Sequence, residues 1–299
     1  MKADRSEPMK LNLALAQINT VLGDVNRNLE KHLTLIKEAR NKGADLIIFP
    51  ELSLTGYILQ DLVPTVALHP DGSDPVFNQL LEASRAIDIM VGFVEEDSRN
   101  RFYIACAYLS DGKVLHVHHK VYLPTYGLFD EGRFFAAGDS VNAFDTRFGR
   151  VGMLICEDFW HASLPYVLWL DGADLFLFAS ASPGRGLPHK NNGCEPGKLD
   201  SARWVDEINR AYAGLFTSFV VHTNRVGYED GLNFWGGASA YNPDGEPIIQ
   251  GPQHQEALVM TELDLNQLHR TRVRLPLLRD EKSSLVLKEI TRINQKHNA

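Results

Sequence analysis

Three residues that could act together in covalent catalysis each follow a short apolar run of the sequence. Glu51 comes after DLIIFP, Lys120 after VLHVHH and Cys156 after RVGMLI. A thiol nucleophile needs a base that takes its proton and a positive group that stabilises the thiolate and the developing oxyanion. Glutamate, lysine and cysteine supply these three parts, so the sequence indicates an acyl-transfer site with Cys156 as its nucleophile.

The positions of these residues support this hypothesis, because each stands just past the C-terminal end of a predicted buried strand. In sheets with helical crossovers, functional sites assemble at that end of the strands. Taken singly, each residue has a simpler interpretation. A carboxylate or an ammonium after a strand usually meets solvent, and a cysteine often fills a core. The prediction therefore depends on the combination.

Two acidic residues, Glu157 and Asp158, directly follow Cys156, and burial and negative charge both raise the pKa of a thiol. An ammonium ~4 Å from a thiolate is worth about 4 kcal/mol at an effective dielectric constant of ~20, against about 0.6 kcal/mol for a carboxylate at ~7 Å through water. We therefore expect Lys120 to lower the pKa of Cys156. We expect Glu157 to point away from the thiol if the strand pleat continues for one more residue.

The elements that must position these residues alternate between apolar strands and amphipathic helices. Strands are predicted at 11–18, 45–49, 89–94, 102–109, 114–119, 150–156, 174–180, 218–224 and 257–265. Helices are predicted at 26–43, 74–87, 163–172 and 198–214. The strands between 89 and 119 follow one another through turns and form a meander, whereas the rest is βαβ-like. The pattern predicts a large mixed sheet, or a pair of sheets, with helices outside.

Composition and charge limit the function classes. The chain has 299 residues and a net charge of −8 with acids and bases interspersed, which argues against nucleic acid as a partner. No stretch reaches the ~18 apolar residues of a membrane-spanning helix, so we expect a cytoplasmic protein that does not enter membranes. We expect a disordered leader at 1–9, one catalytic domain at 10–275 and a C-terminal extension at 276–299.

The cysteines and histidines give no metal pattern. Cys106, Cys156 and Cys194 are widely spaced and form no CxxC motif, which favours a reducing compartment. His116 and His118 share a face of one predicted strand, a spacing that can bind a metal, but no further ligands of matching spacing accompany them. We therefore expect neither a metal nor a cofactor, and we expect Cys156 to be the one reactive thiol of the three.

The segments around the three candidate residues resemble the nitrilase superfamily of carbon-nitrogen hydrolases. FPELSLTGY surrounds Glu51, HHKVYLP surrounds Lys120 and LICEDFW surrounds Cys156, in the family's order, and the resemblance runs from about 11 to 265. YGLFDEGRFFAAGD resembles the family segment that holds a second glutamate, which would be Glu131. The resemblance implies an α/β fold, an αββα four-layer sandwich with two mixed sheets and outer helices. It also implies a homodimer or a larger homo-oligomer.

The resemblance also implies a mechanism. Glu51 would act as the general base, and Cys156 would attack an amide carbonyl to form a thioester, which water then hydrolyses. Lys120 and the backbone N–H of Glu157 would stabilise the oxyanion. Glu131 would hold Lys120 or the substrate in place. The only partners expected, besides a second copy of the chain, are a small-molecule amide substrate and water.

The substrate is less well defined than the reaction. Tyr126, Ser180 and Arg185 fall in segments that would line the substrate pocket, and Arg185 could pair with a substrate carboxylate or lie in a solvated loop. The motifs resemble most closely the glutaminase domain of glutamine-dependent NAD synthetase, but no SGG-type ATP-pyrophosphatase motif follows. Glu157 after the cysteine, where nitrilases commonly have tryptophan, favours an amide over a nitrile.

These features predict a stand-alone amidase that hydrolyses a small linear amide or carbamoyl compound to an acid and ammonia. Three alternatives stay open: a glutaminase subunit that supplies ammonia to a separate synthetase, a nitrilase, and a catalytically silent binding protein on the same fold.

Overall fold

The computed structural model describes residues 9–186 and 199–297, and it contains two six-stranded sheets. The first sheet has the order β14-β1-β2-β3-β4-β5. Its strands are β1 (Lys10–Gln17), β2 (Leu46–Ile48), β3 (Asp88–Glu96), β4 (Phe102–Ser110), β5 (Lys113–His119) and β14 (Ala257–Asp264). Parallel and antiparallel pairs occur together, since β1 pairs in parallel with β2 and antiparallel with β14.

The second sheet has the order β13-β12-β9-β8-β7-β6 and is also mixed. Its strands are β6 (Phe144–Thr146), β7 (Gly149–Ile155), β8 (Leu175–Ser180), β9 (Phe219–Asn224), β12 (Ser239–Tyr241) and β13 (Pro247–Gln250). A separate hairpin joins β10 (Val226–Glu229) to β11 (Leu232–Trp235).

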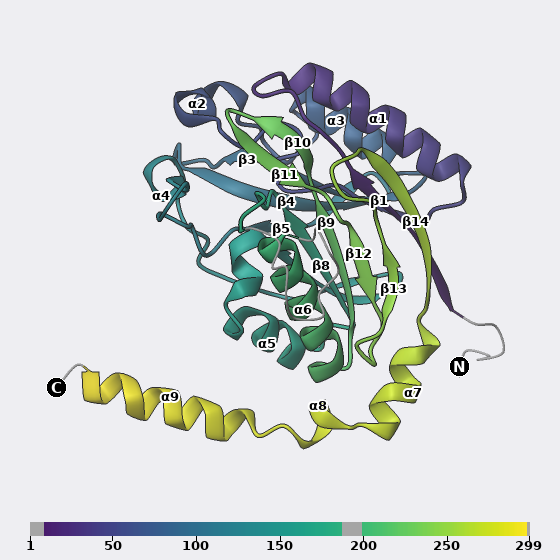
Figure 1. Cartoon of the computed structure of the whole chain (residues 1–299), viewed down its shortest axis with the longest axis vertical. Coiled ribbons are helices and arrows are strands. Elements are labelled where there is room, and N and C mark those ends of the chain that lie inside the picture. Colours follow the sequence, from purple (N-terminus) through teal and green to yellow (C-terminus); the bar gives the residue numbers. More distant parts are fainter. Residues whose placement is uncertain (1–8, 187–198, 298–299) are drawn as a thin grey trace.

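Helices cover the outer face of each sheet (Figure 1). Helices α1 (Val25–Asn41) and α3 (Pro75–Ala83) pack on the first sheet, and α5 (Ser163–Leu170) and α6 (Asp200–Leu215) pack on the second. A third apolar core lies between the sheets and contains Leu13 and Leu15 of β1 with Leu175 and Leu177 of β8. The predicted αββα four-layer sandwich is confirmed.

Local sequence signals explain where the first two helices begin. The side chain of Asp24 accepts a hydrogen bond from the N–H of Arg27 and caps α1. Asp74 accepts from the N–H groups of Val76 and Phe77, and Pro75 occupies the first turn of α3, where its missing N–H costs nothing. These caps fix the two helices that cover the sheet carrying Glu51.

All the predicted strands and helices are present, with ends shifted by a few residues. The structure contains five further strands that the sequence pattern does not predict: β6, β10, β11, β12 and β13. Each of these strands has three or four residues, which is too short for an alternating pattern to stand out.

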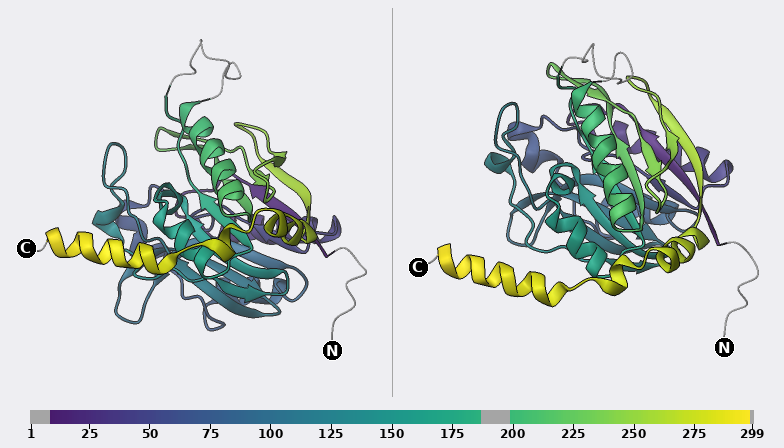
Figure 2. Two further views of the ribbon diagram at one scale, coloured as in Figure 1. Left: turned by 90° about the horizontal axis from the view of Figure 1, so that it is seen from below. Right: turned by 60° about the horizontal axis from the view of Figure 1, so that its bottom comes forward.

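The C-terminal segment leaves the sandwich. Helices α7 (Asn266–Arg274) and α8 (Leu277–Asp280) lead to α9 (Ser283–His297), which projects beyond the body of the molecule in both views of Figure 2. The remaining short helices are η1 (Gln60–Leu62), α2 (Val63–Val66), α4 (Glu131–Phe134) and η2 (Cys156–Trp160). No helix in the described part of the chain is long and apolar enough to cross a membrane. The proposed domain limits, 10–275 and 276–299, stay a prediction.

Candidate active site

Glu51 lies in a tight turn just beyond β2, and its side chain is fully buried. The turn packs directly against β3 at Gly92. A Cβ atom at that position would lie 2.4 Å from the carbonyl oxygen of Pro50 and 2.7 Å from the nitrogen of Leu52. Only glycine therefore allows the backbone that carries Glu51 to approach the neighbouring strand this closely.

Lys120 directly follows β5 and is 1% exposed. Its backbone N–H donates to the carbonyl of Ile104 on β4, and its carbonyl accepts from the N–H of Gly138. These two hydrogen bonds continue the sheet pattern past the end of the strand. They fix the direction in which the long lysine side chain enters the interior.

Cys156 lies at the junction between β7 and η2 in a left-handed backbone conformation with φ of 47°. This conformation costs an L-residue about 1–2 kcal/mol, so the surrounding structure must hold it in place. The chain turns sharply here from a strand into a 3₁₀ helix. The N–H groups at the start of such a helix, which include that of Glu157, have no acceptor within the helix itself.

A buried network of ion pairs joins the candidate residues. The Nζ atom of Lys120 lies 2.8 Å from Oε1 of Glu51 and 2.8 Å from Oε1 of Glu131. The hydroxyl of Tyr57 donates to the same Glu131 oxygen at 2.5 Å. The N–H of Ala181, at the end of β8, donates to Oε2 of Glu51 at 2.6 Å. The structure therefore brings Glu51, Lys120 and Glu131 together.

Cys156 belongs to the same electrostatic environment, in which burial and the carboxylates outweigh Lys120. Burial raises the pKa of the thiol well above its usual range, Glu51 raises it further, and Lys120 lowers it only in part. Lys120 does lower the thiol pKa, as expected, but burial together with Glu51 and Glu131 raises it by more. Cys156 therefore rests as a thiol and needs a base.

The two acidic residues after Cys156 have partners of their own. Glu157 accepts a hydrogen bond from the hydroxyl of Tyr126 at 2.9 Å. It raises the pKa of the Cys156 thiol less than burial, Glu51 or Glu131 does. Asp158 is fully buried and accepts hydrogen bonds from the side chain of His118 and from three backbone N–H groups. Both carboxylates therefore have partners other than the thiol. The strand pleat on which the expected orientation of Glu157 depended does not continue, because β7 ends at Ile155 and η2 begins at Cys156.

Two of the three predicted substrate contacts lie at the surface near the site. Tyr126 is 55% exposed and bonds to Glu157. The guanidinium of Arg185 lies over the ring of Phe129, 4.4 Å from its centroid, and close to Gly127. No carboxylate of residues 9–186 or 199–297 forms an ion pair with Arg185.

Ser180 is not available as a substrate contact. Its side chain is fully buried on the face of β8 that packs against the helices, where its hydroxyl lies 3.0 Å from Nε2 of His222. The period of two along the strand explains the error, because Ala179 and Ala181 face the inner core and Ser180 must face the other way. The backbone at Ala181 contacts Glu51 instead.

Tyr57 and its supports were missed at the sequence level. Glu229 accepts from the N–H groups of Tyr57 and Ile58 at 2.7 and 2.6 Å, and it is bound in turn by the buried guanidinium of Arg225. Tyr57 closes the motif FPELSLTGY, so its position beside Glu51 was visible. The link to Glu229 connects residues 172 positions apart and has no local signal.

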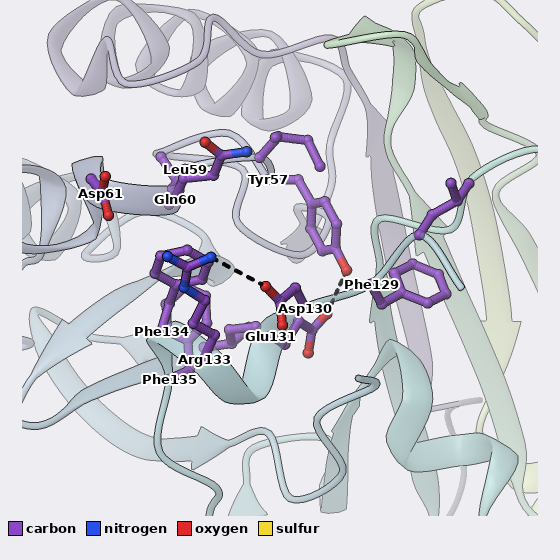
Figure 3. A pocket seen from close by; sticks show the side chains of 13 residues that line it. Tyr57, Leu59, Gln60, Asp61, Phe129, Asp130, Glu131, Arg133, Phe134 and Phe135 are labelled. Atoms are coloured by element: carbon purple, nitrogen blue, oxygen red, sulfur yellow. Dashed lines mark hydrogen bonds and ion pairs between the residues drawn. The ribbon is translucent and has the colours of Figure 1, made fainter. Parts of the chain in front are cut away.

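A cavity of about 210 Å³ adjoins the network. Tyr57 and Glu131 form part of its wall, and Figure 3 shows the ring of Tyr57 pointing toward Glu131, while Arg133 reaches toward Asp130. Its other lining residues are Ile58, Leu59, Gln60, Asp61, Ile104, Leu128, Phe129, Phe134 and Phe135. The second oxygen of Glu131, Oε2, is buried without a partner in the described structure, so it can still bind a donor.

Metal ligation has no support in the geometry. The part of the chain that the structure describes contains no group of three or more His, Cys, Asp or Glu side chains placed to hold an ion. His116 stacks on Phe144, and His118 bonds to Asp158. Cys106 is fully buried in β4, and Cys194 lies outside the described residues.

The chain is similar to known proteins over most of its length. A family profile described as carbon-nitrogen hydrolase matches residues 12–273. The glutamine-dependent NAD(+) synthetase of Acinetobacter baylyi is 33% identical over 256 residues, which are 85% of this chain and 44% of that protein. The chloroplastic omega-amidase of Arabidopsis thaliana is 30% identical over an alignment of 300 positions, which covers 96% of this chain and 77% of that protein. The chain spans less than half the length of the synthetases that it matches.

A solved structure gives the same architecture. The carbon-nitrogen hydrolase of Helicobacter pylori G27 superposes with a TM-score of 0.77 at 21% identity, over 94% of this chain and 98% of that chain. At this level of identity the likeness concerns the fold alone.

Proposed function

This chain belongs to the carbon-nitrogen hydrolase family, and from that premise we propose that it hydrolyses a small linear amide to an acid and ammonia through a thioester on Cys156. The observation that carries the proposal is the buried Lys120 ammonium between Glu51 and Glu131, beside a cysteine in a left-handed turn at a strand end. A base, a cation and a nucleophile are the parts that acyl transfer requires.

In the proposed reaction Glu51 takes the proton of the Cys156 thiol while the sulfur attacks the amide carbonyl carbon. A base is needed because the pKa of the thiol is raised by burial and by the carboxylates, so little thiolate exists before attack. Glu51 suits this role because each of its oxygens accepts one hydrogen bond and keeps a further lone pair. Glu51 then passes the proton to the leaving nitrogen, the carbon–nitrogen bond breaks, and ammonia departs.

Lys120 and the backbone N–H of Glu157 would stabilise the negative oxygen of the tetrahedral intermediate. Removal of one such donor usually costs about 3–4 kcal/mol of transition-state stabilisation. Glu131 would keep the ammonium in place, and its unpaired oxygen would bind an N–H group of the substrate. In the second half of the reaction, water activated by Glu51 attacks the thioester and releases the acid from the sulfur.

Arg185 favours a substrate that carries its own carboxylate. Its guanidinium is half-buried against Phe129, without an ion-pair partner among the described residues, and an arginine binds a carboxylate through two parallel hydrogen bonds. Two relatives are named as a glutamine-dependent synthetase and an omega-amidase, and both names fit a terminal amide. The second candidate function is that of a glutaminase that supplies ammonia to a separate synthetase. It rests on the 33% identity to the glutamine-dependent NAD(+) synthetase of Acinetobacter baylyi.

A panel of amides scored for ammonia release tests the proposal. It should contain glutamine, asparagine, carbamoyl amines, neutral short amides and nitriles, each tried with wild type, Cys156→Ala and Glu51→Gln. We expect turnover of at least one amide, with carboxylate-bearing amides preferred, and loss of at least 1,000-fold in both variants. Cys106→Ala is the matched control and should keep the wild-type kcat, because Cys106 lies in the core of β4.

Other results would assign the chain differently. Turnover of nitriles alone would indicate a nitrilase, and glutamine turnover only with an added synthetase would favour the subunit. A binding protein would be indicated if no compound of the panel is turned over and if Cys156 is alkylated no faster than Cys106.

A further inference from the structure

One carboxylate, that of Asp158, connects the two chain segments that carry Lys120 and Cys156. Its Oδ1 atom accepts from the N–H groups of Val121 and Tyr122, each at 2.9 Å. Its Oδ2 atom accepts from Nε2 of His118 at 2.8 Å and from the N–H of Ile155 at 3.1 Å. All four of its favourable acceptor positions are therefore used.

These hydrogen bonds cross between the two sheets. Lys120 follows β5, which is the edge strand of the first sheet, and Cys156 follows β7 of the second sheet. Asp158 binds residues on both sides of Lys120 and also binds Ile155, the residue just before Cys156. No other described carboxylate accepts hydrogen bonds from residues next to both.

His118 supplies the side-chain half of this link. Its side chain is 2% exposed and that of Asp158 is 0% exposed, so the bond between them is shielded from water and from salt. His116, two residues earlier on the same strand, stacks on Phe144 instead and has no polar contact with the site. The two histidines therefore form a natural pair for comparison.

We propose that His118 and Asp158 are positioning residues that hold Lys120 of one sheet and the Cys156–Glu157 turn of the other at the separation needed to bind one oxyanion. The oxyanion donors must lie about 2.7–3.1 Å from the developing negative oxygen, and a misplacement of ~1 Å can cost about 100-fold in rate. Neither residue touches the reacting atoms. Their effect acts through the relative placement of Lys120 and the N–H of Glu157.

This inference rests on the proposed function only for the identity of the reaction, so a probe independent of the natural substrate can test it. p-Nitrophenyl acetate acylates a thiol: the sulfur–carbonyl bond forms, the ester carbon–oxygen bond breaks, p-nitrophenolate leaves, and the thiol proton goes to the base. That step passes through an oxyanion. Alkylation by iodoacetamide displaces iodide without an oxyanion, so it reports the thiol alone.

The experiment compares both rates at Cys156 in wild type, His118→Ala, His118→Gln and His116→Ala, with the modified peptide identified by mass spectrometry. We expect His118→Ala to slow acylation by about 10- to 100-fold and to change alkylation less than about threefold. His118→Gln, whose amide N–H can replace Nε2, should recover most of the acylation rate. His116→Ala should change neither rate.

The result that would overturn the proposal is a folded His118→Ala protein whose acylation rate is that of wild type, or whose acylation and alkylation rates fall by the same factor. If His118→Ala does not fold, the ratio of the acylation rate to the alkylation rate is measured in His118→Gln and in Asp158→Asn instead. Asp158→Asn leaves two N–H groups without an acceptor. A different result would contradict the proposed function itself: a wild-type Cys156 that iodoacetamide alkylates but p-nitrophenyl acetate does not acylate.

Discussion

At the scale of single residues, burial and the charge of Lys120 have opposite effects on the pKa values of Glu131 and Cys156. Burial alone would lower the pKa of Lys120, but Glu131 and Glu51 raise it well above the usual range, so the ammonium stays charged. One positive charge then lies between two carboxylates, which leaves an excess negative charge in the interior. Burial raises the pKa of Glu131 to about 7, and this carboxyl therefore titrates near neutral pH.

The raised pKa of Glu131 predicts how stability depends on pH. The folded pKa, about 7, lies above the unfolded value of 4.5, so the folded state binds more protons between these pH values. Its contribution to stability is complete below about pH 4.5 and is lost as the pH rises through 7. Each pKa unit is worth about 1.4 kcal/mol, so the free energy of unfolding should fall by about 2–3 kcal/mol from pH 5 to pH 8.

Urea unfolding of wild type and Glu131→Gln at both pH values measures this effect. The variant has no carboxyl at this position, so its free energy of unfolding should not show the decrease between pH 5 and pH 8 that Glu131 causes. Equal pH slopes in the two proteins would show that Glu131 is already ionised at pH 5.

At the scale of elements, the close approach of β3 to the turn after β2 places Glu51. A Cβ atom at Gly92 would overlap the backbone of Pro50 and Leu52, on either side of Glu51. The carboxylate of Glu51 is therefore positioned by the absence of a side chain at Gly92 on the neighbouring strand.

Gly92→Ala should displace the Glu51 turn. We expect a folded protein with kcat lowered at least 10-fold and a free energy of unfolding lowered by about 1–3 kcal/mol, the usual cost of overpacking. Steady-state kinetics and urea unfolding measure the two quantities. Gly72→Ala is the matched control, because a Cβ atom there meets no other atom within 4 Å. Unchanged kcat in Gly92→Ala would mean that the turn absorbs the methyl group elsewhere.

The sequence predicted the elements better than the links between them. Apolar runs located the longer strands, and the residues at their ends, Glu51, Lys120 and Cys156, could be identified because residue type and strand position are both local properties. The raised pKa of Cys156 could not be predicted, because it depends on the depth of burial and on which carboxylates share Lys120. The orientation of Ser180, in contrast, follows from strand alternation, which is a local property of the sequence.

At the scale of the whole molecule, the last part of the chain joins the two sheets. Strand β14 lies at the edge of the first sheet, and α7 then crosses to the end of the second. There, Nη1 of Arg272 binds Asp174 at 2.5 Å, and Nε binds the carbonyl of Thr217 at 3.2 Å. Nη2 binds the carbonyl of Ala173 and the hydroxyl of Ser218, each at 3.1 Å.

Arg272→Met should therefore lower the free energy of unfolding by about 2–3 kcal/mol, because it removes the donors to Oδ1 of Asp174 and to the carbonyl of Thr217. Arg270→Met is the control. Arg270 is paired with Asp264 on the surface, its side chain is 59% exposed, and its loss should cost no more than about 0.5 kcal/mol. Denaturant titration of both variants measures the difference. Equal values for the two would mean that the Arg272 bonds are replaced by water at no cost.

The pairing of β14 with β1 also bears on how the chain is made. Lys10 pairs with Asp264, about 250 residues later, so the outer edge of β1 has no partner until those residues have been synthesised. At ~5–20 residues per second this takes about 10–50 s on the ribosome, during which an apolar strand edge is open to other chains. We therefore expect the yield of soluble protein to depend on translation rate and chaperone supply more than on the stability of the finished fold.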